Sequence, residues 1–229
     1  GIGGLAAGWR HDRCSRGVVA WNAYSTSSML RITAGDFRGR RLKVPKVEAT
    51  RPLVERAREG MFNHLGDLVV DALVWDVYAG SGILGLEALS RGAAQVLAIE
   101  RHPLAAAQLE ENAQLLGCSA HLQCLRMDAY RLAALADRQP APDLIFFDPP
   151  YDNFRIGGEG RIKVWGLFLS LTQRLKPGGC AIVHTPCGIL SEEELGHLPG
   201  VARRDYSQTS LYWWHKPEDP ATSAEPSKS

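Results

Sequence analysis

Short apolar runs alternate with helical patterns along most of this chain, and this alternation restricts the fold more than any other feature of the sequence. Apolar runs of strand length begin at Leu73, Gln95, His121, Leu144 and Cys180, and segments with apolar residues at helical spacing separate them. Strands that alternate with helices in this way form a mostly parallel sheet with helices on both faces. The sequence therefore predicts an α/β protein.

The expected elements have the following bounds. Strands are expected at Leu73–Tyr78, Gln95–Glu100, His121–Met127, Leu144–Asp148, Cys180–Thr185 and Tyr206–His215. Helices are expected at Leu84–Arg91, Pro103–Leu116, Tyr130–Leu135, Val164–Leu175 and Ser191–Leu198. Ahead of the sheet, Leu30–Thr33 and Arg41–Val44 flank a turn and predict a small β-hairpin, and Leu53–Leu65 predicts a helix.

The two ends of the 229-residue chain lack these patterns. Residues 1–28 are rich in Gly, Ser and Ala and predict a disordered leader or extension, and residues 216–229 predict a disordered tail. Between the ends we expect a basic appendage of hairpin and helix at residues 29–66, followed by the main α/β domain at residues 67–215.

The composition excludes several classes of protein. No window reaches the roughly 18 uninterrupted apolar residues that a membrane-spanning helix needs, so we expect no membrane segment. The five cysteines form no C-x-x-C pair, which indicates neither a disulfide framework nor a zinc cluster, and we expect no metal. These features favour a cytoplasmic protein.

Positive charge is concentrated near the N-terminus, although the formal net charge of the chain is only +1. Nine Lys and Arg residues stand against four acidic residues between Leu30 and Phe62. Such a cluster is either an ordinary solvated face or a surface that binds a polyanion. The candidate phosphate-contacting residues are Arg38, Arg40, Arg41, Arg51, Arg56 and Arg58.

The segment after the first core strand is typical of a nucleotide-like ligand, because ligands bind beyond the carboxyl ends of parallel strands. Gly80, Gly82 and Gly85 satisfy G-x-G-x-x-G, and Glu100 ends the next strand, so a dinucleotide-dependent oxidoreductase is one interpretation. Asp76 argues against it, since its carboxylate would repel a pyrophosphate. S-adenosylmethionine has no phosphate and offers an ammonium group to Asp76 and ribose hydroxyls to Glu100. The segment therefore favours S-adenosylmethionine.

The third strand is followed by Asp128 and Ala129. A carboxylate and a backbone N–H suit the exocyclic amine and a ring nitrogen of adenine. An acid after a strand is also a common N-cap of the next helix, and both interpretations stay open here.

The fourth strand ends in Asp148-Pro149-Pro150-Tyr151. Two prolines cannot continue a β-ladder, and they fix the backbone with its carbonyl oxygens directed into the crevice. If Asp148 and the Pro149 carbonyl accept both N–H bonds of an exocyclic amine, the nitrogen is held for in-line attack. Tyr151 then offers an aromatic surface for a flipped-out base. We expect these four residues to form the catalytic centre.

Several segments together resemble a known family. The motif Asp148–Tyr151, with Arg31–Leu42, Thr50–Pro52, Arg58–Asn63 and Ala79–Ala93, is similar to the RsmD-type 16S ribosomal RNA guanine-N2 methyltransferases. The resemblance runs from about residue 31 to residue 215, and the N-terminal 28 residues and the Gly-rich stretch 156–161 depart from it. It implies a Rossmann-like class I methyltransferase fold and transfer of a methyl group from S-adenosylmethionine to N2 of one guanine.

The resemblance also implies the roles of individual residues and the partner. By matching position, cofactor contacts fall on Asp76, Gly80, Gly82, Glu100 and Asp128, to which Ala129 is added from its position after the strand. Asp148 to Tyr151 are expected to hold the base, and the basic appendage is expected to bind phosphates. The expected partner is 16S ribosomal RNA within a small-subunit assembly particle, bound by a monomer.

Two further functions remain open. An N6-adenine DNA or RNA methyltransferase uses the same D-P-P-Y motif, but it normally needs a sizeable target-recognition region, for which there is no room between Asp152 and Val164. A catalytically inactive RNA-binding assembly factor is the other alternative. The intact set of Asp76, Gly80 and Asp148 argues against it.

Overall fold

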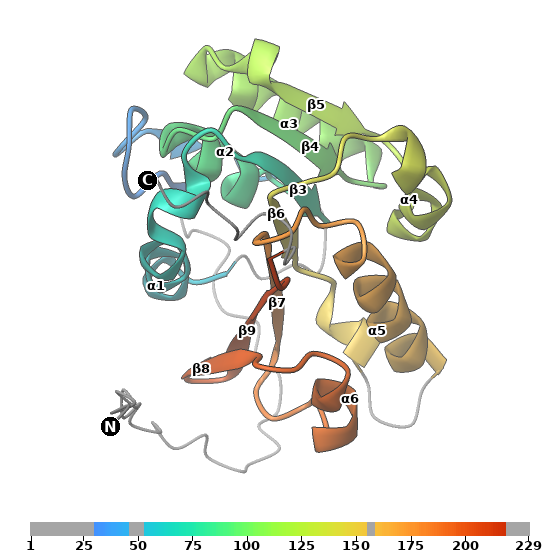
Figure 1. Ribbon diagram of the computed structural model, residues 1–229. Helices are drawn as coiled ribbons and strands as arrows, with labels where there is room; N and C mark the ends of the chain where they lie inside the picture. Colours follow the sequence, from blue (N-terminus) through green and yellow to red (C-terminus); the bar gives the residue numbers. More distant parts are fainter. Residues whose placement is uncertain (1–29, 46–52, 155–158, 219–229) are drawn as a thin grey trace, which may run out of the picture.

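The computed structural model describes residues 30–45, 53–154 and 159–218. Its centre is a seven-stranded sheet in the order β5-β4-β3-β6-β7-β9-β8 (Figure 1). The first four neighbouring pairs in this order are parallel, and the two pairs that include β9 are antiparallel. The prediction of an α/β protein with a mostly parallel sheet is confirmed.

The elements have these bounds. The strands of the main sheet are β3 (Leu73–Val77), β4 (Gln95–Ile99), β5 (Leu122–Leu125), β6 (Leu144–Phe147), β7 (Cys180–Pro186), β8 (Ala202–Tyr206) and β9 (Thr209–His215). The α-helices are α1 (Glu55–Leu65), α2 (Ile83–Ser90), α3 (Pro103–Leu116), α4 (Ala129–Leu135), α5 (Glu159–Thr172) and α6 (Glu192–Gly196). Single 3-10 turns form η1 (Gly66–Val69), η2 (Ser119–His121), η3 (Ala136–Arg138) and η4 (Tyr151–Phe154).

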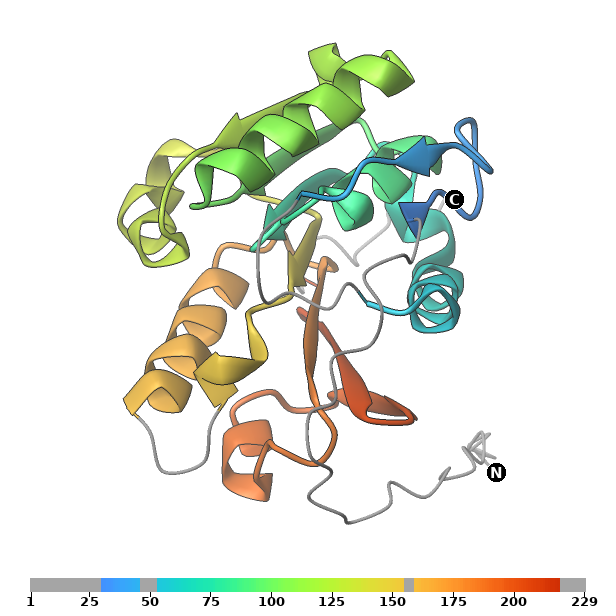
Figure 2. The ribbon, with the colours of Figure 1, turned by 180° about the vertical axis from the view of Figure 1, so that it is seen from behind.

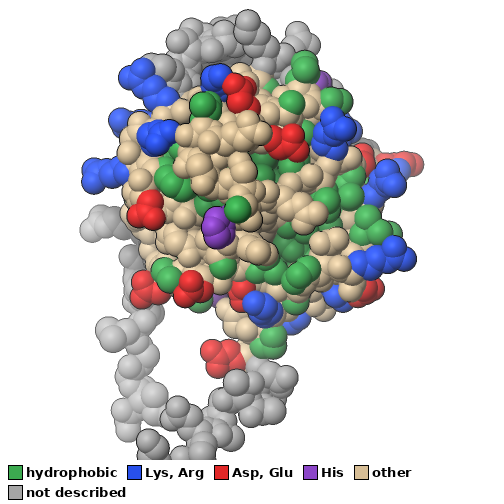
Figure 3. Space-filling view, turned by 90° about the horizontal axis from the view of Figure 1, so that it is seen from above, with side chains coloured by type: hydrophobic (Ala, Val, Ile, Leu, Met, Phe, Trp, Pro, Cys, Tyr) green, Lys and Arg blue, Asp and Glu red, His purple; other side chains and the backbone are tan. Residues whose placement is uncertain are grey.

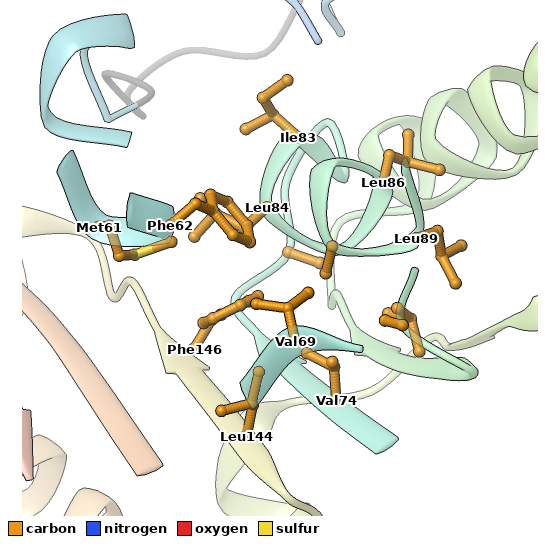
Figure 4. Close-up of a cluster of buried hydrophobic side chains, with 14 of the residues drawn as sticks. Met61, Phe62, Val69, Val74, Ile83, Leu84, Leu86, Leu89, Leu144 and Phe146 are labelled. Carbon is orange, nitrogen blue, oxygen red and sulfur yellow. The ribbon is translucent and has the colours of Figure 1, made fainter. Parts of the chain in front are cut away.

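Both faces of the sheet are covered. Side chains alternate along each strand, so that Val74 and Phe146 join the core beneath α1, α2 and α3, as the close-up of this cluster shows (Figure 4). Trp75 and Phe147 point to the opposite core, which α4 and α5 cover. Burial on both faces explains why the central strands are almost wholly apolar rather than alternating.

Local sequence signals set the ends of α3, whose observed bounds equal the expected ones. His102 is the N-cap and its ring nitrogen Nδ1 accepts the Leu104 N–H, while Pro103 occupies the first helical position. Gly117 ends the helix with a φ of 76°, a left-handed conformation that glycine adopts readily. The helix therefore places Glu100, just before its N-cap, at the carboxyl end of β4.

The expected hairpin is present but short. β1 (Leu30–Arg31) pairs antiparallel with β2 (Arg41–Leu42), and the hairpin lies beside α2 in both ribbon views (Figures 1 and 2). Gly35 has a φ of +78°, and a Cβ there would lie 1.7 Å from the Ser90 carbonyl oxygen, so only glycine fits this close approach. Leu30 and Leu42 belong to the same core as the sheet. The division of the chain after residue 66 stays a prediction.

One expected strand was wrong. The structure divides Tyr206–His215 into the end of β8 and the whole of β9, with a turn at Ser207, whose φ is 54°. β8 was not predicted because its middle residues, Arg203 to Asp205, are charged. Charged residues are typical of an edge strand, which has one open side and needs no apolar run.

The expected leader, residues 1–28, lies outside the described residues, as do residues 219–229 of the expected tail. Lys216, which we expected to begin that tail, is instead held in place. Its backbone N–H donates to the Gly179 carbonyl oxygen at 2.9 Å, and its ammonium group donates to the carbonyl oxygens of Gln173 and Leu175, just beyond the end of α5. Among the helices of the described segments, none is long and apolar enough to cross a membrane.

Candidate active site

The turn between β3 and α2 carries three departures from ordinary backbone geometry. Tyr78, Gly80 and Gly82 all have positive φ, at 68°, 56° and 80°. The N–H groups of Tyr78 and Ala79 both donate to the Ile99 carbonyl oxygen, which fastens the turn to the end of β4. The expected glycine-rich turn is therefore present, with its backbone at the carboxyl edge of the sheet.

Glu100 joins this turn to the next one. Its Oε2 accepts the Gly80 N–H at 2.9 Å, and its Oε1 accepts the His102 N–H at 2.7 Å. A carboxylate offers about four lone-pair sites, so Glu100 can accept further hydrogen bonds while it holds both turns. The structure thus brings together Gly80 and Glu100, two of the residues that the sequence assigned to the cofactor.

Asp76 lies beneath the glycine turn. Its side chain is buried, at 1% exposure, and its Oδ2 accepts the Gly85 N–H at 2.9 Å. Burial raises the pKa of this carboxyl to about 7, against the lowering effect of the Gly85 N–H. This hydrogen bond holds the first turn of α2, and the expected contact of Asp76 with the cofactor stays a prediction.

Asp128 is the N-cap of α4. Its Oδ1 accepts the Tyr130 N–H at 3.0 Å, and its Oδ2 lies 3.8 Å from Nη1 of Arg101. The N-cap interpretation that we left open is confirmed. The carboxylate is also exposed at the carboxyl edge of the sheet, next to the buried Ala129, and the adenine contact of these two residues stays a prediction.

The segment from Asp148 to Tyr151 lies beside the glycine turn. β6 pairs with β3, and the Asp148 N–H donates to the Val77 carbonyl oxygen at 3.2 Å. Pro149 is buried and Pro150 partly exposed, and η4 begins directly after them at Tyr151. Gly80 and Asp148, which are 68 positions apart in the sequence, therefore lie near the centre of the same edge of the sheet.

His184 is a site residue that the sequence did not reveal. It lies on β7, and its ring nitrogen Nδ1 is 2.6 Å from Asp148 Oδ1, while Nε2 is 3.0 Å from the Tyr151 hydroxyl. The same hydroxyl lies 3.1 Å from Thr209 Oγ1 on β9. A single histidine in an apolar strand has the pattern of a core residue, and only the pairing of β7 with β6 and β9 signals its role.

The basic residues of the appendage fall into different environments. Arg38, Arg41 and Arg56 are exposed or partly exposed, and Arg40 is exposed as well but donates to the Leu115 carbonyl oxygen at 2.6 Å. Arg51 lies outside the described residues. Seen from above, Lys and Arg side chains lie around the edge of the molecule with acidic side chains among them (Figure 3).

Arg58 does not belong to this surface. Only 1% of it is exposed, its Nη2 donates to the Arg31 carbonyl oxygen at 2.7 Å, and its Nε lies 3.5 Å from the buried Glu87 carboxylate. Burial lowers the pKa of Arg58, and Glu87 opposes that shift. The prediction that Arg58 contacts phosphates was wrong, because its charge is turned inward to a carboxylate of α2.

The strand order, the glycine turn with Glu100 after the first two strands and the D-P-P-Y segment after β6 together define a class of protein. They are the fold and the site arrangement of the class I S-adenosylmethionine-dependent methyltransferases. The expected fold class is thereby confirmed.

The family follows from comparison with known proteins. A family model described as "Conserved hypothetical protein 95" matches residues 30–215, and the chain belongs to this family, the RsmD family of methyltransferases. A Bacillus subtilis relative, YlbH, is 30% identical over 188 residues, which cover 82% of this chain and 99% of the relative. "Ribosomal RNA small subunit methyltransferase D" of Escherichia coli (strain K12) is 40% identical over 129 residues. That match covers 56% of this chain and 63% of the relative.

Solved structures agree with this assignment. The Escherichia coli protein yhhF superposes with a TM-score of 0.66 at 29% identity, over 83% of this chain and 99% of that one. An RNA methyltransferase from Salinibacter ruber, solved in complex with S-adenosyl-L-homocysteine, has a TM-score of 0.51 at 16% identity, over 78% of this chain and 98% of that one. The second likeness concerns the fold alone.

Proposed function

We propose that this protein transfers a methyl group from S-adenosylmethionine to the exocyclic N2 of a guanine in 16S ribosomal RNA. The observation that carries the proposal is the position of Asp148 to Tyr151, which follow β6 and lie beside the glycine turn of β3. The name of the Escherichia coli relative supports ribosomal RNA as the substrate. Because the matched segment spans 63% of that relative, the activity and substrate of this chain are proposals.

The residues present fit S-adenosylmethionine, which supplies an electrophilic methyl group on a sulfonium. Glu100 retains acceptor capacity for the ribose hydroxyls, and the Asp128 carboxylate is exposed at the same edge for the adenine amine. A side chain at Gly80 would meet no neighbouring atom, so its positive φ of +56° is what requires glycine there. The turn then presents bare backbone to the ligand.

Asp148 makes the amine reactive in this proposal. The lone pair of a purine exocyclic amine is delocalised into the ring, which makes it a poor nucleophile. Two hydrogen bonds, to the Asp148 carboxylate and the Pro149 carbonyl, orient the nitrogen and stabilise the positive charge that develops on it. When bound, S-adenosylmethionine would supply the methyl group and leave as S-adenosylhomocysteine, and the Asp148 carboxylate would accept the proton that the nitrogen loses.

Tyr151 serves as the surface on which the flipped-out base stacks. The contacts of its hydroxyl with His184 and Thr209 hold the ring in one orientation, and the residue is partly exposed. Stacking on a fixed aromatic ring compensates for part of the cost of removing a base from its helix.

The appendage binds the RNA backbone in this account. Arg38, Arg40, Arg41 and Arg56 are accessible at the surface and can contact phosphates, which position the RNA without reading its sequence. Recognition of the particular guanine then depends on RNA shape. We propose a small-subunit assembly particle as the substrate, a monomer as the active form and the cytoplasm as its location.

The substitution Asp148→Ala tests the site directly. We expect the variant to lose at least about 100-fold in kcat, because the amine is no longer oriented. Its affinity for S-adenosylhomocysteine, measured by calorimetry, should stay close to that of the wild type. Asp148→Asn should lose less, because the amide oxygen can still accept one hydrogen bond. If Asp148→Ala kept more than about a tenth of the wild-type kcat, the orienting role would be refuted.

A further inference from the structure

His184 contacts two of the residues that we assign to catalysis, although it lies on β7 and both of them follow β6. Nδ1 is 2.6 Å from Asp148 Oδ1, and Nε2 is 3.0 Å from the Tyr151 hydroxyl. Its side chain is buried, with 4% of the residue exposed. One ring therefore bridges the residue expected to bind the amine and the residue expected to stack on the base.

The chemistry of the partners fixes the direction of the hydrogen bond between His184 and Asp148. An ionised carboxylate has no proton to donate, so Nδ1 must donate to Asp148. The Tyr151 hydroxyl has a single proton and two possible acceptors: it donates to Thr209 Oγ1 at 3.1 Å, and Nε2 of a neutral imidazole is the alternative acceptor at 3.0 Å. The Thr209 hydroxyl on the far side of Tyr151 donates to the Thr185 carbonyl oxygen at 2.9 Å, which anchors the chain of contacts in the backbone of β7.

The surroundings strengthen these contacts. His184 and Asp148 line a small cavity whose other walls are apolar, formed by Leu53, Met61, Leu84, Phe146, Phe147, Ile182 and Leu211. Hydrogen bonds in such a low-dielectric environment are stronger than in water, and an unpaired polar group there is costly. Loss of the imidazole would leave Asp148 Oδ1 facing this cavity without that donor.

From this arrangement we propose that His184 is a positioning residue that holds the Asp148 carboxylate and the Tyr151 ring as one unit. This inference rests on the proposed function and deepens it, because it names the residue that keeps the Asp148 carboxylate and the Tyr151 ring in a fixed position relative to each other. By occupying Oδ1, His184 leaves Oδ2 of Asp148 for the amine of the substrate. Through its contact with the hydroxyl, it fixes the angle of the ring against which the base stacks.

Two substitutions of His184 separate this role from simple packing. His184→Ala removes both contacts, and we expect kcat to fall roughly 10- to 100-fold, while the KM for S-adenosylmethionine changes less than about threefold. His184→Asn keeps an N–H donor near the position of Nδ1, so it should recover much of the loss in kcat. A kcat of His184→Ala within about twofold of wild type would overturn the proposal. A kcat of His184→Asn that is no higher than that of His184→Ala would overturn it as well.

A double-mutant cycle with Tyr151→Phe tests whether the two contacts form one unit. If His184 acts through Tyr151 as well as Asp148, the double variant should lose little more activity than His184→Ala alone. If the fold-loss of activity in the double variant equalled the product of the two single losses, the residues would act independently, and the proposal that they form one unit would be overturned. His215→Asn is the matched control, since it is an exposed histidine on β9 that pairs with Cys180 at the opposite end of β7, and its kcat should equal that of wild type.

The same cycle measured by urea unfolding needs no substrate. A non-additive effect of His184→Ala and Tyr151→Phe on the free energy of unfolding would support the coupled contacts, and additive effects would contradict them. If wild-type protein transfers no methyl group to ribosomal RNA, the proposed function fails, yet this cycle still decides whether His184 couples to Tyr151. The two failures are therefore distinguishable.

Discussion

A single buried carboxyl group, Asp76, decides how the glycine turn is built. The Asp76 side chain reaches under the turn and accepts the Gly85 N–H, and a Cβ at Gly85 would lie 3.0 Å from that same oxygen. The third glycine of the motif is thus required by the close approach of two side chains, Asp76 from β3 and Val96 from β4, since Val96 Cγ1 would lie 2.8 Å from the same Cβ. Sequence spacing marked the position of Asp76 but not its hydrogen bond to the Gly85 N–H.

The buried carboxyl makes stability depend on pH. The pKa of Asp76 is about 7 in the folded protein against an ordinary value of 3.8, so the folded state favours the neutral acid. Its unfavourable contribution is absent at low pH, grows as the pH rises from about 4 to about 7, and is complete above that. We expect Asp76→Asn to gain stability relative to wild type over this range, by up to about 4 kcal/mol.

Urea unfolding at pH 5 and at pH 8 measures this difference. Asp67→Asn is the matched control, because Asp67 is exposed and its substitution should give the same difference in the free energy of unfolding at both values. If the free energies of unfolding of Asp76→Asn and wild type also differed by the same amount at pH 5 and pH 8, the Asp76 carboxyl would be ionised in the folded protein over this whole range.

Residue identity and spacing predicted some of the site and missed the rest for a physical reason. Asp148 and Glu100 were predicted because an acid directly after a core strand must lie at the carboxyl edge of the sheet. His184 and Arg58 were not, since their roles depend on partners 36 and 29 positions away that only the folded chain brings near. Long-range pairing of polar groups leaves no local pattern in a sequence.

Among the elements, the contact of the hairpin with α2 depends on a buried carboxylate. Glu87 accepts the N–H groups of Thr33 at 2.9 Å and Ala34 at 3.1 Å, and it pairs with Arg91 at 3.0 Å and Arg58 at 3.5 Å. One side chain of α2 thereby binds the segment after β1, the start of α1 and the end of its own helix. The appendage is fastened by charge as well as by apolar contact.

Substitution of Glu87 by alanine should be costly. It leaves Arg58 buried without a charged partner and two backbone N–H groups without an acceptor, so we expect a loss of about 3–5 kcal/mol in the free energy of unfolding. The control is Glu55→Ala on α1, which breaks the exposed pair with Arg31 and should cost less than about 1 kcal/mol. Equal losses in urea unfolding for the two variants would contradict the anchoring role of Glu87.

Elements whose ends carry a local signal were predicted most closely, and charged ones were not. The helix expected at Val164–Leu175 runs from Glu159 to Thr172, so its expected start was five residues too late. α3 agrees at both ends because a proline, a cap and a glycine mark them. β8 was missed because Arg203, Arg204 and Asp205 give it no apolar face, and it forms only by pairing with β9. An edge strand that depends on its neighbour has little signal of its own.

At the scale of the whole molecule, the accessible basic residues of the appendage are expected to bind RNA. Neutralising Arg38, Arg41 and Arg56 together should weaken the binding of RNA whatever the sequence of that RNA. The slope of log affinity against log salt should become shallower by roughly 0.7 to 0.9 for each phosphate that is no longer bound. Affinity for the cofactor should not change. Binding measured at two salt concentrations is sufficient to determine the slope.

The matched control removes equal charge elsewhere. Arg131, Arg138 and Lys163 are exposed on α4, η3 and α5, and their triple alanine variant should keep a salt slope close to that of wild type. If both triple variants changed the slope equally, binding would follow net charge rather than the appendage. If neither did, the three arginines of the appendage would be ordinary solvated residues.

The central claim is methyl transfer to N2 of guanine, and the position of the transferred methyl group tests it most directly. Wild-type protein is incubated with labelled S-adenosylmethionine and small-subunit particles from a strain that lacks the modification, and the labelled nucleotide is then isolated and mapped. The account predicts label on N2-methylguanine at one position of 16S ribosomal RNA, and none with Asp148→Ala. Label on N6 of adenine, or no transfer by protein that binds S-adenosylhomocysteine, would contradict it.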